Sequence, residues 1–321
     1  DSKMMTKTTS ALAVAALVGA GIGTASAATF QIDDTTTVGV GGAFYPYVFN
    51  TKDADGNSKT NYGNANRLIF TAEKEAVDGM TASLYYQLRP QGALDGTSDE
   101  NDAGVRTHVA YATLAGDFGA VKFGKSHGVW YRYLDVIADK NDVLTYTFSN
   151  VNRRTRPLNY ASPDFDGFGF EVEAQLQGDS EKGSTIGTYD DNGTDKDVVT
   201  SNKTSTINAA AYADLDAVRV HVAYAEGNLR NSNSDGAYGI GAVTSIQDVK
   251  VDAYYKYSNI YKDGNGGTPK QKIYGVIGQV DYDGGVFQLG AQQVKGDNVA
   301  SRTEVIARAS YSLADNVYVS A

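Results

Sequence analysis

The sequence predicts an all-β protein: a sixteen-stranded antiparallel transmembrane β-barrel that lacks its last one to two strands. Three observations predict this fold. Apolar and polar residues alternate with a period of two, short turns alternate with long polar connections, and the composition suits many strands joined by tight turns. The 321 residues include 22 tyrosines, 35 glycines and only 5 prolines. Strands favour aromatic residues, whereas proline is excluded from most ladder positions.

The N-terminal residues 1–27 are predicted to be a secretory signal peptide. A start with two lysines is followed by small apolar residues over 10–23, and Ala25-Ser26-Ala27 is a small-x-small cleavage site. The alternative is a transmembrane anchor, but the apolar run is short and rich in glycine and alanine for a span of about 20 residues. The barrel is therefore assigned to residues 28–321.

Alternation is clearest over residues 301–313. One face carries the apolar residues Val305, Ala307, Ala309, Tyr311 and Leu313, and the other carries Arg302, Glu304, Arg308 and Ser310. The same period recurs over 81–89, 217–226 and 249–258. Because successive side chains of a strand point to opposite faces, each segment is predicted to be a strand with one apolar and one wet face.

A soluble β-sandwich would give the same alternation, with its apolar face turned inward. Two features favour a membrane barrel instead. The apolar faces carry many small residues and tyrosines, whereas the polar faces carry full charges in mid-strand, which a water-filled lumen tolerates. In lipid every backbone N–H and C=O needs a partner within the protein, so the sheet is expected to close on itself.

The connections alternate in length, as they do at the two rims of an outer-membrane barrel. Short turns are predicted at Asp78-Gly79, Asp117-Phe118-Gly119, Asp214-Leu215-Asp216 and Asp283-Gly284-Gly285. Long polar connections are predicted at 51–63, 92–103, 126–152, 179–203, 228–236 and 260–270. About fourteen complete strands fit between residues 35 and 313, and residues 316–321 look like the start of another. Even-numbered barrels are the rule, so the final strand is expected to be missing. No helix is predicted after the signal peptide.

The composition argues against several other classes of protein. The absence of cysteine excludes thiolate chemistry, and the formal net charge of −10 argues against nucleic acid as a partner. The three histidines, His108, His127 and His221, have no metal-ligand spacing. Acidic stretches at 53–57 and 190–195 resemble calcium loops, but the first has its glycine at the wrong position. No nucleophile–base set is evident. We therefore predict no catalytic residue, no metal and no cofactor.

Two motifs resemble those of the general bacterial porins, which are trimeric sixteen-stranded barrels. Segment 114–125, Leu-Ala-Gly-Asp-Phe-Gly-Ala-Val-Lys-Phe-Gly-Lys, is similar to their turn between strands four and five. Segment 158–168, Leu-Asn-Tyr-Ala-Ser-Pro-Asp-Phe-Asp-Gly-Phe, is similar to a strand–turn–strand motif of the same family, and Asn66-Arg67-Leu68 is placed to open strand two. The resemblance implies a homotrimer in the outer membrane of a Gram-negative bacterium, exported through the periplasm and surrounded by lipid and lipopolysaccharide.

The resemblance also implies a constriction. In general porins the third loop folds into the barrel, and its acids face a ladder of arginines on the wall. Here the loop falls at about 126–152, and its candidate acids are Asp135, Asp139 and Asp142. The candidate basic wall is Arg67, Arg106 and Arg153. For each of these residues the alternative is ordinary solvated charge. Opposed walls would create a transverse field, which low-dielectric protein focuses across a narrow aqueous gap.

Side-chain parity supports the three arginines. Arg67 alternates with Leu68 and Phe70, so it is expected on the lumen face. By the same argument Arg106 is expected to oppose Val105, Val109 and Tyr111, and Arg153 to oppose Leu158 and Tyr160.

These inferences predict a water-filled pore for passive diffusion of ions and small hydrophilic solutes, with no bond made or broken. The net acidity favours cations, whereas the arginines and Lys122, Lys125 and Lys140 favour anions. On balance the pore is predicted to be weakly cation-selective. One alternative is a substrate-specific channel, to which the loop residues Trp130, Tyr131 and Tyr133 would contribute. The other is a structural or enzymatic barrel.

Overall fold

The computed structural model describes residues 28–320 except 45, 53–57, 65, 91–103, 139–152, 155–156, 177–184, 192–193, 200–204, 227–235, 260–269, 298–300 and 315–316. The signal peptide predicted at 1–27 lies outside the described residues. Two compact units divide the described chain, an N-terminal unit up to Gly116 and a C-terminal unit from Asp117 onward.

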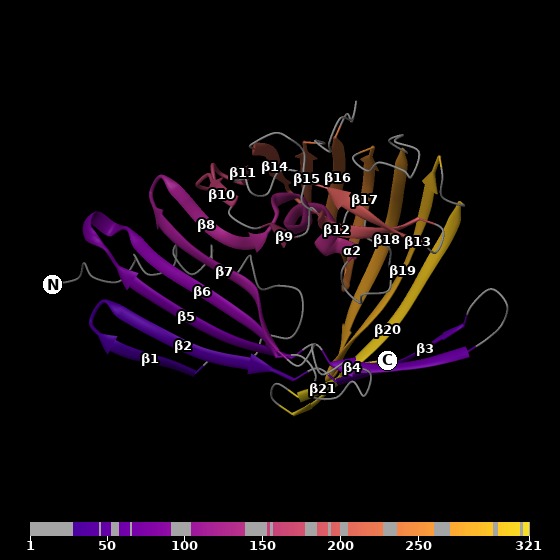
Figure 1. The fold of residues 1–321 in the computed structure, drawn as a ribbon, viewed down its shortest axis with the longest axis horizontal. Coiled ribbons are helices and arrows are strands. Elements are labelled where there is room, and N and C mark those ends of the chain that lie inside the picture. Colours follow the sequence, from indigo (N-terminus) through magenta and orange to yellow (C-terminus); the bar gives the residue numbers. More distant parts are fainter. Residues whose placement is uncertain are drawn as a thin grey trace. The chain divides into compact units, whose positions relative to one another are not determined.

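The N-terminal unit is an antiparallel sheet with a separate hairpin (Figure 1). Its sheet strands are β1 (Ala28–Asp33), β2 (Thr36–Ala43), β5 (Arg67–Glu75), β6 (Thr81–Pro90) and β7 (Val105–Gly116), each paired with the next. The one-turn helix η1 (Val77–Gly79) joins β5 to β6. The hairpin consists of β3 (Pro46–Lys52) and β4 (Ser58–Asn64).

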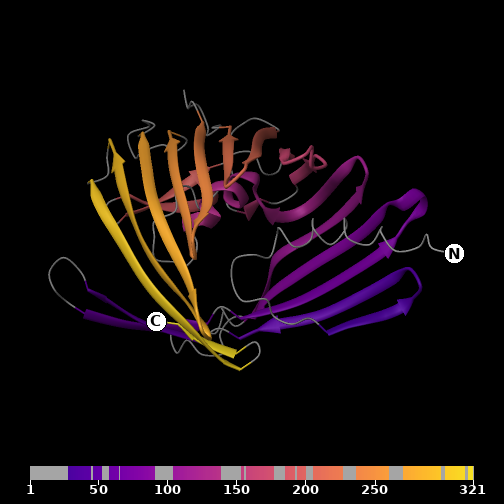
Figure 2. The same ribbon diagram turned by 180° about the vertical axis from the view of Figure 1, so that it is seen from behind.

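The C-terminal unit is a longer antiparallel sheet, seen from the front in Figure 1 and from behind in Figure 2. Its strands are β8 (Gly119–His127), β9 (Arg153–Arg154), β10 (Pro157–Ala161), β11 (Phe168–Leu176), β14 (Ser205–Leu215), β15 (Val218–Ala225), β16 (Ala237–Ile246), β17 (Val249–Ser258), β18 (Gln271–Tyr282), β19 (Gly285–Gly296), β20 (Arg302–Ala314) and β21 (Val317–Ser320). Strand β8 pairs with both β9 and β10, and from β10 onward each strand pairs with the next in this order. A separate hairpin holds β12 (Thr185–Asp191) and β13 (Thr194–Val199).

The strand count predicted from the sequence is confirmed. Between residues 35 and 313 the described residues form fourteen strands of the two main sheets, besides the two-residue β9 and the two separate hairpins, and β21 lies where the start of another strand was expected. Strand β1 was not anticipated. The short turns are also confirmed: β7 ends at Gly116 and β8 begins at Gly119, and β18 ends at Tyr282 and β19 begins at Gly285. The expected loss of a final strand stays a prediction.

Burial is inverted relative to a soluble β-sandwich, and this decides between the two readings of the alternation. The apolar residues Val305 and Leu313 of β20 are 65% and 60% exposed, and Leu84 of β6 is 58% exposed. On the opposite face Glu173 of β11 and Lys256 of β17 are both 0% exposed. We call these the apolar face and the polar face of each sheet. An exposed apolar face of this extent is expected where lipid, rather than a protein core, covers it. No described helix is long and apolar enough to cross a membrane.

Gly119, the first residue of β8 after the turn from β7, has both a left-handed backbone and no room for a side chain. Its φ is 98°, and a Cβ there would collide with the carbonyl oxygen of Ala161. We expect Gly119→Ala to destabilise the barrel by more than about 1 kcal/mol. The matched control is Gly79→Ala, where φ is 74° but nothing lies within 4 Å of the added Cβ. The measurement is the temperature at which folded protein converts to the unfolded band on an unboiled gel, and an equal fall in both variants would contradict the steric part of this argument.

The turn between β10 and β11 is fastened by Asp164. Its carboxylate accepts hydrogen bonds from the Tyr212 hydroxyl at 2.6 Å and from the backbone N–H of Gly167 at 2.8 Å. These two bonds hold the pKa of Asp164 below its ordinary value of 3.8. The carboxylate therefore stabilises the folded turn above that pH, and the stabilisation is lost as the pH falls through the folded-state pKa. We expect the unfolding temperature of the native chain to fall more steeply than that of Asp164→Asn between about pH 5 and pH 2. Parallel curves would show that the bonds carry no stability.

Candidate pore constriction

A short helical segment follows β8, where the sequence predicted only a long polar loop. Helix η2 (Tyr131–Asp135) continues directly into α2 (Val136–Ala138). Its apolar residues Trp130, Leu134 and Ile137 recur at spacings of four and three, which places them on one helical face. That spacing is the signal that would have revealed the helix. We call residues 128–138 the helical segment.

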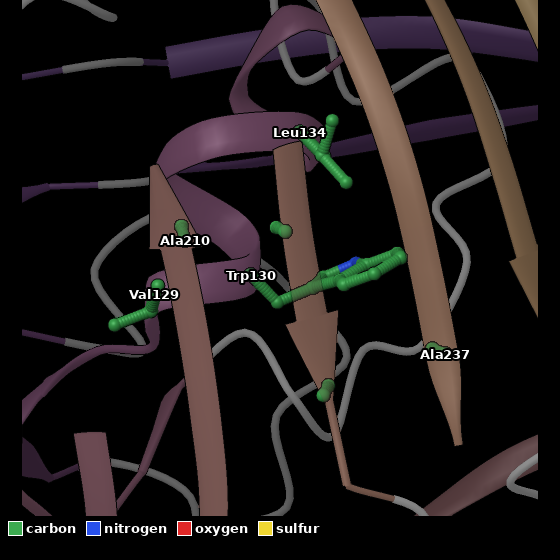
Figure 3. Close-up of a cluster of buried hydrophobic side chains, with 7 residues drawn as sticks. Val129, Trp130, Leu134, Ala210 and Ala237 are labelled. Atoms are coloured by element: carbon green, nitrogen blue, oxygen red, sulfur yellow. The ribbon is translucent and has the colours of Figure 1, made fainter. Parts of the chain in front are cut away.

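The helical segment packs on the polar face of the C-terminal sheet. Val129, Trp130 and Leu134 are 0% exposed, and they cluster with small residues of β14, β15 and β16, namely Ala210, Ala223, Ala225 and Ala237. Figure 3 shows Trp130 and Leu134 among the strands that carry Ala210 and Ala237. Alanine side chains leave the depth that an indole ring needs, so the wall is shaped to receive this segment.

Two glycines of β16 extend the space for the helical segment. A Cβ on Gly239 would lie 2.6 Å from Cδ1 of Leu134, and a Cβ on Gly241 would lie 3.0 Å from Cδ1 of Ile137. Farther along the wall, Ile137 packs in a second buried cluster with residues of β17 to β20, namely Tyr254, Ile273, Ile277, Val294 and Ile306. Apolar side chains on the polar face are therefore concentrated where the segment covers them.

An ion pair fastens the end of η2 to the wall. Nζ of Lys256 on β17 donates to Oδ1 of Asp135 at 2.7 Å, and their side chains are 0% and 1% exposed. The same ammonium lies 4.9 Å from the ring centroid of Tyr254. A buried charge is costly unless it is paired, so each member of this pair depends on the other.

Two glutamates of β11 fasten the start of the segment. Glu171 accepts hydrogen bonds from Nη1 of Arg132 at 2.8 Å, from the Tyr133 hydroxyl at 3.2 Å and from Nδ2 of Asn159 at 3.2 Å. Burial, together with the nearby Glu171 carboxylate, raises the pKa of Tyr133 well above its ordinary value, so this hydroxyl keeps its proton.

The neighbouring Glu173 accepts from the backbone N–H of Val129 at 3.3 Å and from Nδ2 of Asn208 at 2.8 Å. The segment is thus held at both ends by three charged groups from two strands, Glu171 and Glu173 of β11 and Lys256 of β17.

Of the three predicted acids of the third loop, the structure describes one. Asp135 lies in the helical segment and is neutralised by Lys256. Asp139 and Asp142 lie outside the described residues. Whether these three carboxylates line the pore stays a prediction.

The N-terminal unit brings arginines together on the polar face of three adjacent strands. Arg89 of β6 is paired with Arg106 of β7. The last pair of the β5–β6 ladder at this end is Leu68 with Leu88. Arg67 and Arg89 are the next residues of the two strands and therefore lie opposite each other. We call Arg67, Arg89 and Arg106 the arginine row. Arg67 and Arg89 are half-buried, and Arg106 is exposed.

The parity argument for Arg106 was partly wrong, because β7 contains a bulge. Gln87 pairs with Val109 but Leu88 pairs with Thr107, so His108 is an extra residue. Arg106 does oppose Val105, which is 63% exposed. Val109, however, pairs with buried Gln87, so the bulge places Val109 on the same face as Arg106.

Tyr111 also lies on the polar face rather than the apolar one. Its ring stacks on that of Tyr85 at 5.3 Å, and the two residues are directly paired across β6 and β7. For Arg153 the structure gives only the main chain, which pairs with His127; its side chain lies outside the described part.

Comparison with known proteins decides the family. Residues 11–321 match the family described as Gram-negative porin. The chain belongs to the Gram-negative porins. No curated protein sequence matches it.

Solved porins show that the fold is the antiparallel porin β-barrel. The anion-selective porin from Comamonas acidovorans is 15% identical with a TM-score of 0.67, and the alignment covers 87% of this chain and 85% of that one. OmpF of Salmonella typhi, solved in complex with daunomycin, is 18% identical with a TM-score of 0.66, covering 91% of each chain. A mutant porin of Rh. blastica is 13% identical with a TM-score of 0.60, covering 89% of this chain and 92% of that one. At these identities the likeness shows the fold.

Family and fold together make this porin an outer-membrane channel protein. Sequence reasoning missed two parts of its site. Lys256 lies in the alternating segment 249–258, but nothing local in the sequence shows that it meets Asp135. The polar face of Arg89 could have been predicted, because Arg89 lies two positions from Gln87 in the alternating segment 81–89. Only the strand register shows that it stands between Arg67 and Arg106.

Proposed function

We propose that this porin is a passive diffusion channel for ions and small hydrophilic solutes, narrowed by the helical segment. The observation that carries the proposal is that this segment is packed on the polar face, which lines the lumen of a porin barrel. A segment held there by apolar packing and buried ion pairs reduces the open cross-section. Solutes would then be sorted by size, with no bond made or broken, and we propose that the working assembly is a homotrimer.

We further propose that the pore wall favours anions. The arginine row brings three positive charges to one patch, whereas the charge of Asp135 is cancelled by Lys256. Charges at a narrow aqueous passage act on ions more strongly than charges spread over the outer surface, because the surrounding protein has a low dielectric constant. The net charge of −10 favours the opposite, a weak cation preference. The net charge, however, counts every charged residue of the chain equally, whether or not it lies near the pore.

A planar lipid bilayer with a salt gradient tests both proposals. We expect stepwise openings in groups of three and a reversal potential with the sign of anion preference. Replacing Arg89 and Arg106 by glutamine should move the reversal potential toward cation preference, since two charges leave the wall. Failure of properly folded protein to form channels would overturn the channel proposal. A cation-selective reversal potential that the two substitutions leave unchanged would overturn the role of the arginine row.

A further inference from the structure

We propose that Tyr85 and Tyr111 form a stacking site for planar aromatic solutes on the wall of the channel. The two residues are directly paired across β6 and β7, and their rings are stacked with centroids 5.3 Å apart and an angle of 13° between the planes. Both residues are half-buried, so part of each ring stays accessible on the polar face. This inference rests on the proposed function, because it names a class of solute that the diffusion channel would retain during passage.

The aromatic residues of the helical segment do not offer such a surface. Trp130 is 0% exposed and Tyr131 is 9% exposed. The Tyr133 hydroxyl donates to Glu171, and its ring meets that of His221 edge to face. The sequence suggested these three aromatic residues for a substrate-specific channel, but packing in the protein takes up their rings. The stacked pair instead lies on the polar face of the N-terminal unit.

The stack has short neighbours on its β5 side. Tyr85 has Tyr111 on one side and Thr71 of β5 on the other, and Thr71 is paired in turn with Gly39 of β2. A Cβ added to Gly39 would collide with Oγ1 of Thr71, so the threonine hydroxyl lies over the glycine. The ring face of Tyr85 that is turned away from Tyr111 is therefore flanked by one short side chain and by a residue without one.

The spacing of the sheet suits a third ring in this place. Carbon atoms in contact lie about 3.5–4 Å apart, and neighbouring strands lie about 4.8 Å apart. A planar solute stacked on Tyr85 would therefore lie above Thr71, parallel to the two tyrosine rings. The Thr71 hydroxyl is both a donor and an acceptor, so it suits a polar group at the edge of the solute.

The chemistry of the site selects flat rings, whether or not they are charged. Aromatic rings attract one another in offset parallel arrangements. Stacking on an aromatic side chain tolerates many planar rings, because it depends on the π-face rather than on a pattern of hydrogen bonds. Sugars present no such face and would gain little from the site. The selection proposed here therefore depends on the shape of the solute and adds to any selection by charge.

The test uses caffeine as the planar solute and glucose, which has a similar size but no aromatic face, as the reference. Added to one side of a planar bilayer, caffeine should interrupt the single-channel current in a saturable way, whereas glucose at equal concentration should not. Saturation-transfer NMR of caffeine with the detergent-folded protein should give the same affinity. Because caffeine is uncharged, the charge of the arginine row does not attract it.

Three substitutions test the stack itself. Tyr85→Leu removes one ring and should weaken caffeine binding about tenfold, within the range for stacking on aromatic side chains, whereas Tyr85→Phe should keep the native affinity. Thr71→Leu keeps both rings but fills the space above β5, and it should weaken binding to a similar degree. Thr71→Leu and Tyr85→Phe also decide the matter if Tyr85→Leu gives no folded band on an unboiled gel.

The matched control is Tyr274→Leu, which removes a tyrosine from the apolar face of β18, where Tyr274 is 40% exposed. This variant should keep the affinity of the native chain. Equal weakening in Tyr274→Leu and Tyr85→Leu would overturn the site, and so would equal interruption of the current by glucose. Protein that binds caffeine but opens no channels would retain the site and overturn the proposed function. Channels that conduct ions but do not bind caffeine would do the reverse.

Discussion

Replacing Lys256 by methionine is expected to release the end of the helical segment and to change the single-channel conductance. The substitution leaves the carboxylate of Asp135 buried without its cation, and breaking a buried pair in this way costs about 3–5 kcal/mol. Moving the segment toward water relieves that cost, because Asp135 can then be hydrated. We expect a lower unfolding temperature and a conductance that is larger or fluctuates between levels, measured on gels and in bilayers respectively.

A double variant separates this effect from a general loss of packing. In Lys256→Met with Asp135→Leu both charges are removed, and replacing a buried pair by apolar groups is often neutral or stabilising. We expect the double variant to recover most of the unfolding temperature and a steady conductance. A double variant as unstable as the single one would show that the two residues act independently, and the ion pair would then not be what positions the segment.

Gly241→Leu is expected to push the helical segment off the wall by steric contact alone. The added side chain would meet Ile137 and Leu134 of the segment and His221 of β15, with carbons that lie 3.0 Å, 3.4 Å and 3.1 Å from an ideal Cβ at this position. Overpacking of this kind costs about 1–3 kcal/mol, and displacement of a short helical segment relieves it more cheaply than distortion of a paired strand. We expect an altered conductance and a changed size limit for uncharged sugars in liposome swelling.

The control for this substitution is Gly278→Leu on β18. A Cβ there would meet nothing closer than 3.8 Å, and Gly278 alternates with the buried Ile277, so its added side chain faces away from the segment. This variant should keep the native conductance and sugar limit. Adding Ile137→Ala to Gly241→Leu should restore part of the native behaviour. A conductance unchanged by Gly241→Leu would mean that the segment does not narrow the pore.

Much of the fold was predictable because the two faces of a strand can be read from the alternation of neighbouring residues. Alternation over 81–89 and 301–313 gave both the strand and the face that meets lipid, and the exposed Leu84 and Val305 confirm it. Turns were predictable where glycine and aspartate mark them, as at 117–119 and 283–285. These properties depend on residues one or two positions apart.

The site was less predictable because it depends on distant residues meeting. Asp135 and Lys256 are separated by 121 positions in the chain, and no local pattern reports such a pair. The helical segment was missed since its apolar spacing is short and lies inside a long polar connection. The position of Arg89 beside Arg106 follows only from the register of β6 with β7. Because β7 contains one extra residue, counting alternate positions along it assigns Val109 and Tyr111 to the wrong face.

The bulge at His108 gives strand β7 an unusual tolerance of length. Removing one residue from a strand normally turns every residue on one side of the cut to the opposite face, which in a barrel would send charges into lipid. In β7 the extra residue already stands outside the regular pairing, with Thr107 and Val109 matched to neighbouring positions of β6. Deleting His108 would restore an uninterrupted ladder and leave Arg106 and Tyr111 directed as they are now. A chain without this residue would therefore keep Arg106 and Tyr111 on the same face, so a one-residue gap in an alignment at this place would mark a change in strand twist rather than a turn of the neighbouring side chains toward lipid.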